Sequence, residues 1–356
     1  MLRVFVRRSG DVRYFTDDRA LEIEGLRDGP AGWWLRGEGD AASERDVARV
    51  LTSTPKSEVV GYDLIFAAPR PLSMLLALHP DQGSALVRVQ RASVRSAMSY
   101  LEEHALVVRE RRGGDDRDLA ARWESAIGFT HGVNRHGEPH LHDHVLVGAR
   151  PADADRVLDS RALFAHARAA DALYRTSLRY ELARRTPFQA QRSFHGVEVV
   201  AGLDEGYRTL WGGHHDVRGE KRSWQRDEIV EKWRGDLERF EPLGGRVERI
   251  ATSSRLDEHR FGASLEGRHE VARRHLVEAW SDAAVTGHDP HEVRASIASL
   301  YPELGAARGV RETTLGVHRA RQIELVREGG ARPLAIVELE QWRQRSRERS
   351  RESRSR

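Results

Sequence analysis

The stretch Pro139-His140-Leu141-His142-Asp143-His144-Val145-Leu146-Val147 carries the most information in this 356-residue chain. Residues two apart on a β-strand project to the same face, so the side chains of His140, His142 and His144 point together. Three imidazoles on one face are hard to explain as packing, because each ring has nitrogens that need hydrogen-bond partners. Histidines at this spacing are common metal ligands. The pattern therefore predicts a metal site built on a strand.

The residues before this stretch complete a predicted β-hairpin. Residues 124–131 (ESAIGFTH) and 140–148 (HLHDHVLVG) are expected to be its two strands. The loop between them, 132–139 (GVNRHGEP), is rich in residues that favour turns. The hairpin brings His131, at the end of the first strand, close to the start of the second.

We expect the ligand set to be His131, His142 and His144, because two ligands on one strand and one on its neighbour form a compact cap. His140 is the alternative third ligand, and His136 in the loop is expected to be exposed to solvent. Three neutral histidines leave a divalent ion its full charge and open coordination positions. Such a site favours catalysis at an anionic oxygen, such as that of a phosphodiester, over a structural role.

A second unusual residue, Asp63, lies in the strand-like segment Val59–Ala67 (VVGYDLIFA), which Pro69 and Pro71 bring to an end. Aspartate is depleted in strands. One explanation is an exposed position on an edge strand. The other is a carboxylate in the site, which orients a metal-ligating imidazole or accepts a proton.

The remaining segments predict an α+β fold. We expect an antiparallel sheet with helices on one face, then a mostly helical C-terminal region beyond a boundary near 241–245. A first strand is expected at 1–8 and a further strand at 195–201. Helices are expected at 72–78, about 84–108, 160–185 with Ser160 as N-cap, 223–240, 266–284 and from about 291.

The composition excludes several classes of site. The chain has no cysteine, which excludes disulfides, zinc–thiolate sites and thiol catalysis, and favours a reducing cytoplasm. No apolar run reaches the length of a membrane span. The segment Met1–Arg8 is too short and too alternating for a signal peptide.

Positive charge is concentrated at the C-terminus. The net charge is +3, but residues 342–356 (WRQRSRERSRESRSR) carry seven arginines and two glutamates, which leaves the first 341 residues at about −2. The basic tail has two interpretations, a phosphate-binding segment without sequence preference or a solvated, disordered end. Overall basicity is therefore no argument that the folded body binds nucleic acid.

Two motifs, in the same order and at similar spacing, resemble those of one enzyme family. The segment Gly61–Ser73 (GYDLIFAAPRPLS) resembles the G-x-D-L-T-F-S-x-P-K-S-V-S signature of MobF-class conjugative relaxases, the TraI and TrwC group. The segment Pro139–Val147 resembles the P-x-L-H-T-H histidine motif of the same group, and His131 lies where that family supplies its first ligand. The likeness extends over roughly residues 1–240.

The resemblance implies a five-stranded antiparallel palm with an HUH-type active site. In such a site a tyrosine near the N-terminus attacks the scissile phosphate of single-stranded DNA at an origin of transfer. The products are a 5′-phosphotyrosine bond and a free 3′ hydroxyl. The metal on His131, His142 and His144 would stabilise the charged transition state. Asp63 matches the family aspartate that helps to activate the tyrosine.

Tyr14 is the nucleophile that the resemblance implies, because it is the only tyrosine before Tyr62. A phenol with a pKa near 10 needs a base or a nearby cation to attack at neutral pH. Asp63 and a divalent ion would supply these. The family activators are Mg²⁺ or Mn²⁺, whereas histidine ligands also suit Zn²⁺.

Several residues are candidates for contact with DNA. Arg70 keeps the positive charge of the family's P-K-S element, although Pro71 alters the turn. Trp33 and Trp34 have two interpretations, stacking on DNA bases or core packing. The same alternatives hold for Trp211 and Trp224.

The sequence also departs from the family. Phe15 follows Tyr14, where the family has a cluster of tyrosines, and no Walker A pattern is present. The chain is thus expected to be a stand-alone relaxase or a fragment, with a helicase and a coupling protein as separate partners.

The expected division of the chain is a catalytic domain at 1–240, a helical region at 241–340 that clamps DNA and a disordered tail at 341–356. The alternatives to a relaxase are a rolling-circle replication initiator of the same chemistry, a DNA-binding accessory protein that no longer cuts, and a three-histidine hydrolase of small phosphodiesters.

Overall fold

The structure is a computed structural model, and it describes most of the chain. None of the helices formed by the described residues is long and apolar enough to span a membrane. The described residues are 1–8, 33–34, 50–51, 58–112, 115–123, 126–151, 156–193, 196–203, 206–211, 224, 226–240, 256–305, 309 and 312–321.

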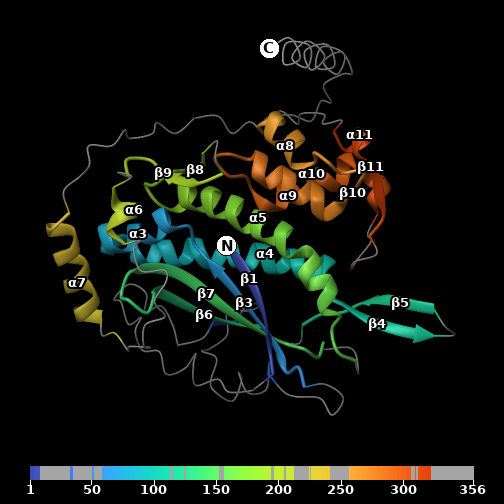
Figure 1. The fold of residues 1–356 in the computed structure, drawn as a ribbon, viewed down its shortest axis with the longest axis horizontal. Coiled ribbons are helices and arrows are strands. Elements are labelled where there is room, and N and C mark those ends of the chain that lie inside the picture. The colour runs from blue at the N-terminus through green and yellow to red at the C-terminus, as the bar shows by residue number, and fades with distance from the viewer. Residues whose placement is uncertain are drawn as a thin grey trace, which may run out of the picture.

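The centre of the fold is an antiparallel sheet with strand order β1-β3-β7-β6-β2 (Figure 1). Its strands are β1 (Leu2–Arg7), β3 (Gly61–Ala67), β7 (Pro139–Gly148), β6 (Ala126–Val133) and β2 (Trp33–Trp34). Four of these are full strands. The fifth, β2, contributes only the pairs Trp33↔Gly128 and Trp34↔Ile127 at the edge of β6. The expected antiparallel sheet is therefore confirmed, but its main part has four strands and not five, since a two-residue strand adds little to the ladder.

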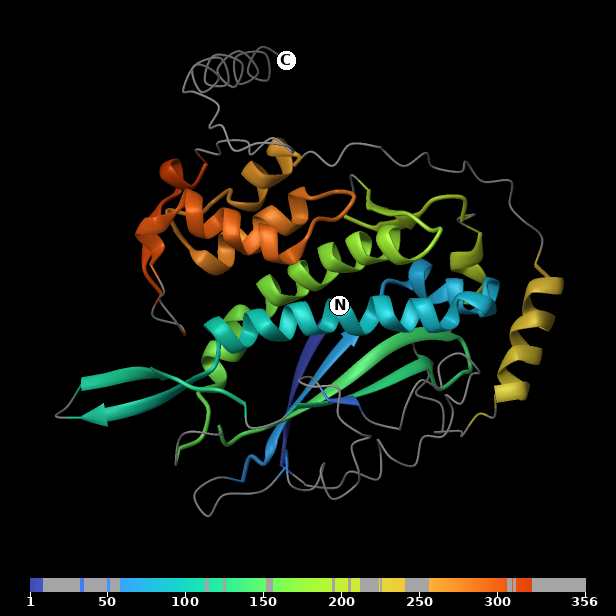
Figure 2. The ribbon, with the colours of Figure 1, turned by 180° about the vertical axis from the view of Figure 1, so that it is seen from behind.

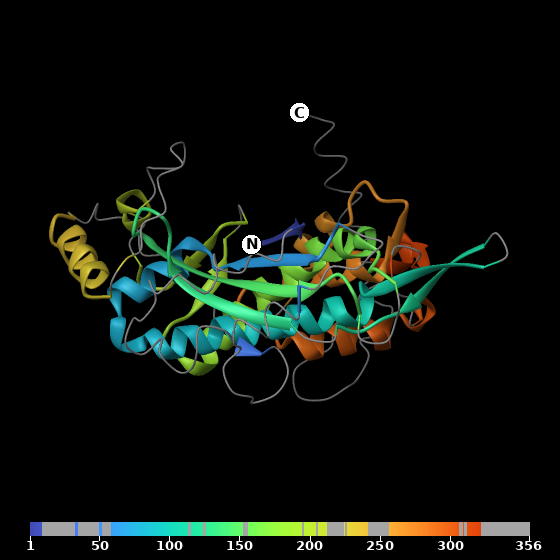
Figure 3. The ribbon, with the colours of Figure 1, turned by 90° about the horizontal axis from the view of Figure 1, so that it is seen from below.

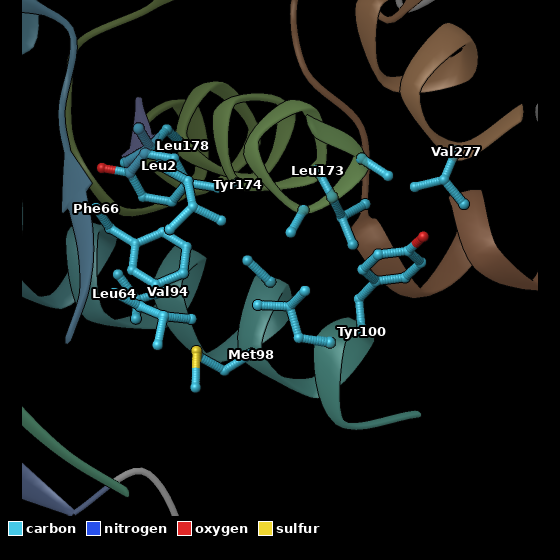
Figure 4. Packing of buried hydrophobic residues seen from close by; sticks show 14 of the residues in the cluster. Leu2, Leu64, Phe66, Val94, Met98, Tyr100, Leu173, Tyr174, Leu178 and Val277 are labelled. Carbon is cyan, nitrogen blue, oxygen red and sulfur yellow. The ribbon is translucent and has the colours of Figure 1, made fainter. Parts of the chain in front are cut away.

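One face of the sheet packs on two long helices. Alternate residues of β3, Tyr62, Leu64 and Phe66, are almost fully buried against α4 (Gly83–His104) and α5 (Ser160–Arg185). Figure 2 shows both helices lying across this face. In Figure 4 the rings of Phe66 and Tyr174 meet at the contact, with centroids 5.3 Å apart. This layer is the main hydrophobic core.

The helix α5 begins and ends where its sequence provides caps. The carboxylate of Asp159 accepts a hydrogen bond from the backbone N–H of Arg161, and arginines occupy the last turn. The predicted bounds 160–185 are confirmed. The predicted N-cap Ser160 was one residue late, since Asp159 has the extended backbone and the accepting side chain.

The opposite face of the sheet carries a smaller hydrophobic cluster formed by Val50, Leu51, Val60, Ile127, Phe129 and Leu146. Gly61 and Gly148 lie beside this cluster. A Cβ on Gly61 would meet the side chain of Leu51 at 2.6 Å, and one on Gly148 would meet the carbonyl oxygen of Val50 at 2.6 Å. Glycine at both positions lets residues 50–51 approach the sheet closely.

The C-terminal helices pack on the side of α5 away from the sheet (Figure 1). Arg179 of α5 is buried and joins three elements. Its guanidinium donates to the Glu198 carboxylate at 2.6 Å and to the carbonyl oxygens of Ser281 and Ala284. The elements of this part are β8 (Ala190–Arg192), β9 (Glu198–Val200), α6 (Tyr207–Leu210), α7 (Arg226–Glu238), α8 (Glu258–Ser264), β10 (Glu270–Ala272), α9 (Arg273–Ala283), α10 (Pro290–Leu300), β11 (Thr314–Gly316) and α11 (Val317–Ala320).

A hairpin of β4 (Val107–Arg112) and β5 (Asp115–Ala120) projects from the body of the molecule (Figure 3). The predicted helix at 84–108 was too long, because α4 ends at His104 and the chain turns into β4. Cross-strand pairs of opposite charge, such as Arg109 with Asp118, hold this hairpin.

Other predicted elements were shifted by pairing between distant segments. The helix expected at 266–284 begins only at Arg273, because 270–272 pair with 314–316 as strands. The strand expected at 195–201 is β9, paired with β8. The helices α3 (Arg70–Leu78), α7 and α10 confirm those expected near 72–78, 223–240 and 291. The boundary near 241–245 lies outside the described residues.

Candidate active site

The hairpin of β6 and β7 brings three histidines together on the face of the sheet away from α4 and α5. His131 of β6 pairs directly with His142 of β7, and His144 lies two residues further along the same strand. One potential ligand atom of each residue lies within 4.8 Å of the others. The ring centroids are 5.1, 5.2 and 5.4 Å apart. The predicted convergence of these three side chains is confirmed.

Hydrogen bonds fix how two of the rings are presented. The Nδ1 of His142 donates to the carbonyl oxygen of His140 at 2.8 Å, and that of His144 donates to both carboxylate oxygens of Asp63 at 3.0 Å. A ligating histidine usually donates its other ring nitrogen to a carbonyl or a carboxylate in this way. In both residues Nε2 is thus the nitrogen that would coordinate, and the residues present fit a metal ion.

The protonation state of the cluster suits a metal as well. Burial lowers the pKa of His142 well below its usual value, and the neighbouring His140, His131 and His144 lower it further. A ligating imidazole must be neutral. Around neutral pH His142 therefore already has the form that a metal ion needs.

His140 lies at the edge of the cluster. Its ring centroid is 4.6 Å from that of His142, but the group of mutually close ligand atoms does not include it. Burial, followed by the N-terminal ammonium and Arg70, lowers the pKa of His140 to about 4. The geometry favours His131 over His140 as the third ligand.

Asp63 occupies a buried position on β3, with 5% of its surface exposed. The exposed edge position that the sequence left open is therefore excluded. Instead the carboxylate lies in the site and faces a candidate ligand, His144.

A family comparison identifies the chain. The model of the TrwC relaxase family matches residues 34–213, which is half of the sequence. The chain belongs to the TrwC relaxase family. Enzymes of this family nick DNA and transfer its strands. The matched range contains Asp63, Arg70 and the three clustered histidines, whereas Tyr14 lies before it.

Solved structures of conjugative relaxase TrwC have the same fold. A metal-bound complex with oriT DNA shares 18% identity and a TM-score of 0.52, and a metal-free complex shares 18% and 0.54. Both alignments cover 70% of this chain and 100% of the solved one. At this identity the likeness shows the fold alone. A search of curated proteins gave no significant match.

The remaining candidates have different positions in this relaxase. Arg70 is half-buried at the start of α3, close enough to His140 to lower its pKa. Tyr14 lies outside the described residues, as do the side chains of Trp33 and Trp34. His136 is half-buried, not exposed as expected. Its backbone N–H donates to the side-chain oxygen of Asn134 within the turn.

Trp211 and Trp224 serve packing in the relaxase fold. Trp211 is 2% exposed, and its indole N–H donates to Asp236. Trp224 packs against Gly137 at the tip of the hairpin, where a Cβ would meet the indole at 2.8 Å. The alternative of base stacking by these two residues is not supported.

Sequence reasoning missed a polar contact behind the histidines. Asp143, between His142 and His144, is fully buried on the opposite face of β7. Thr130 of β6 donates to its carboxylate at 2.6 Å, and Arg91 of α4 donates to the Thr130 hydroxyl at 3.1 Å. These two hydrogen bonds connect β6 and β7, the strands that carry the histidines, to helix α4. The available signal was Asp143 itself, a carboxylate between two histidines of the H-L-H-D-H segment, on the face of β7 that the hydrophobic residues Leu141 and Val145 share.

Proposed function

We propose that this relaxase cuts and rejoins single-stranded DNA at an origin of transfer by tyrosine transesterification. The observation that carries the proposal is the convergence of His131, His142 and His144, with Asp63 holding the last of these. The arrangement fits the MobF class and its HUH-type chemistry. Related solved structures of TrwC are complexes with oriT DNA, which supports the same kind of substrate here.

Tyr14 is the proposed nucleophile. Its phenolic oxygen attacks the scissile phosphorus and forms the phosphotyrosine bond as the bond to the 3′ oxygen breaks, which leaves a free 3′ hydroxyl. The reverse attack by a 3′ hydroxyl rejoins the strand and restores the tyrosine. Each cycle of attack and reversal conserves the number of phosphodiester bonds, so no energy source is needed.

The three histidines would hold a divalent ion, which when bound neutralises charge on the non-bridging phosphate oxygens. Mg²⁺ or Mn²⁺ is the proposed activator from the family resemblance, with Zn²⁺ as the alternative from ligand type. Asp63 keeps Nδ1 of His144 protonated and thereby directs Nε2 into the site. The geometry thus supports an orienting role for Asp63.

DNA would lie along the face of the sheet that carries the histidines. Arg70 is proposed to contact a phosphate, and Trp33 and Trp34 to stack on bases. The proposed division of the chain is catalytic at 1–240 and helical at 241–340, with a basic tail at 341–356. A helicase and a coupling protein are proposed partners, and a cytoplasmic location remains a prediction from the lack of cysteine.

A denaturing gel tests this function. The purified protein is incubated with a labelled single-stranded oligonucleotide that spans its origin of transfer, with each divalent ion in turn and with a chelator. We expect a covalent protein–DNA band that needs the ion and the uncut sequence. Binding without any covalent band would favour a non-cutting accessory protein. Cleavage without a covalent band would favour a phosphodiester hydrolase.

A further inference from the structure

An aromatic side chain lies beside the candidate metal site on the edge strand β1. Phe5 pairs directly with Asp63 of β3, the residue whose carboxylate accepts from His144. Side chains directly opposite each other in an antiparallel pair share a face and lie roughly 5 Å apart at Cβ. Phe5 is therefore a lateral neighbour of a residue that orients a proposed ligand.

The burial pattern confirms the face on which Phe5 lies. Leu2 and Val4 of β1 pack with the main core under the helices, and Tyr62 and Leu64 do so on β3. Successive strand residues alternate between faces, so Phe5 and Asp63 lie on the other face, with the histidines.

The Phe5 ring is open to solvent, with 46% of its surface exposed. Single exposed apolar residues are common and by themselves indicate nothing. Phe5 differs from them in its position, because no strand of the described sheet lies on the outer side of β1. The Phe5 ring is thus a solvent-accessible aromatic surface at the border of the site.

A basic residue, Arg3, lies on the same face of β1 as Phe5. Arg3 pairs with Ile65, which in turn pairs with His144, so Arg3 lies in the same cross-strand row as a proposed ligand. Arg3 is exposed, and it forms no ion pair with the residues that the structure describes. An aromatic face and an accessible cation together are the features with which proteins bind single-stranded nucleic acid.

We propose that Phe5 and Arg3 form a nucleotide-binding subsite on β1, in which a base stacks on the Phe5 ring and a phosphate contacts Arg3. The occupant is the single-stranded DNA that runs from the scissile phosphate across the sheet face toward β1. This proposal rests on the proposed function for its substrate. It assigns a positioning role to Phe5, since the ring holds a base near the site without taking part in bond exchange.

The test combines a protein variant with missing bases in the DNA. Affinity is measured with chelator present, for oligonucleotides in which one base at a time near the cleavage site is replaced by an abasic nucleotide. For wild-type protein, one abasic position should weaken binding by roughly five- to a hundred-fold, the usual range for a stacked base. Phe5→Ala should show the same loss with intact DNA and no further loss with DNA abasic at that position.

Matched variants keep the test specific. Val6→Ala changes the next residue of the same strand, 41% exposed and on the opposite face, and should bind every oligonucleotide as wild type does. Phe5→Trp should keep or strengthen binding and preserve the abasic effect. Arg3→Gln should weaken binding to all sequences alike and flatten its salt dependence by about 0.7 in slope.

The proposal would be overturned if Phe5→Ala and Val6→Ala bound the oligonucleotides with equal affinity. It would also be overturned if every abasic position weakened binding to Phe5→Ala as much as it weakens binding to wild type. Failure of wild type to bind single-stranded DNA would overturn it too. Failure of the proposed function is a separate outcome. In that case the coupling between Phe5 and one base persists, while wild type forms no covalent adduct with metal present.

Discussion

Both carboxylate oxygens of Asp63 lie 3.0 Å from Nδ1 of His144, and the pair is buried between adjacent strands. Because a carboxylate only accepts, the proton on Nδ1 is fixed and Nε2 faces the cluster of histidines. The pair therefore links β3 to the proposed metal site on β7.

Asp63→Asn should weaken metal binding without unfolding the protein. The amide still fits the space but lacks the negative charge that makes the imidazole a better ligand, so we expect a loss of about 10- to 100-fold in metal affinity. Calorimetric titration of Mn²⁺ measures the effect. Asp81→Asn, at an exposed position on the surface, is the control. Unchanged Mn²⁺ affinity in Asp63→Asn would remove the orienting role.

Thr130→Val should lower the free energy of unfolding by weakening the contact of the β6–β7 hairpin with α4. It removes the hydroxyl that donates to buried Asp143 at 2.6 Å. Losing a hydrogen bond to a charged, buried group costs about 1.5–3 kcal/mol in the free energy of unfolding. Urea denaturation measures this cost, and Thr130→Ser should recover most of the stability. If the serine variant is as unstable as the valine variant, the hydroxyl is not the cause.

Gly137→Ala should destabilise the tip of the β6–β7 hairpin. Gly137 has a φ of +70°, and a Cβ there would meet the ring of Trp224 at 2.8 Å. The left-handed backbone alone costs a non-glycine residue roughly 1–2 kcal/mol. Gly262→Ala, within helix α8 and with nothing near its Cβ, should instead stabilise by about 0.5–1 kcal/mol. Thermal unfolding of the two variants should shift the midpoint in opposite directions.

The stability of the protein should fall between about pH 6.5 and pH 4, in part through His166. This residue is fully buried, with Nε2 donating to the Gly309 carbonyl and Nδ1 accepting from the Tyr100 hydroxyl. Burial lowers its pKa to about 4. The unfolded chain thus binds a proton that the native state does not, and the contribution is lost as pH falls toward 4.

The variant His166→Gln isolates this contribution. Glutamine does not titrate, so the free energy of unfolding should depend less steeply on pH over that range, whatever the absolute stability of the variant. Urea denaturation at several pH values gives the slope. An unchanged slope would show that His166 contributes nothing to the acid sensitivity.

Local patterns predicted the elements closest to the site. The alternation of histidines with Leu141 and Asp143 on β7 predicted that the histidine side chains share one face of the strand. Because side chains alternate with a period of two, burial of Leu141 and Asp143 on one face places the histidines on the other. The clear amphipathic pattern of 160–185 predicted α5 to the residue.

Other features depend on partners far away in the sequence. Residues 270–272 are strand only because 314–316 pair with them, and Ala105 ends α4 although apolar residues continue to Val108. The contact between Arg91 and Thr130 joins a helix to a strand 39 residues away. No local pattern encodes such contacts, so these were the parts that the sequence could not predict.

The most direct test of the account is to identify the residue that carries the DNA. Protein incubated with its single-stranded substrate and a divalent ion is digested, and the nucleotide-bearing peptide is mapped by mass spectrometry. The account predicts one modified peptide with the nucleotide on Tyr14, absent from Tyr14→Phe and from His142→Ala. A nucleotide on another residue, or a covalent product that persists in Tyr14→Phe, would contradict it.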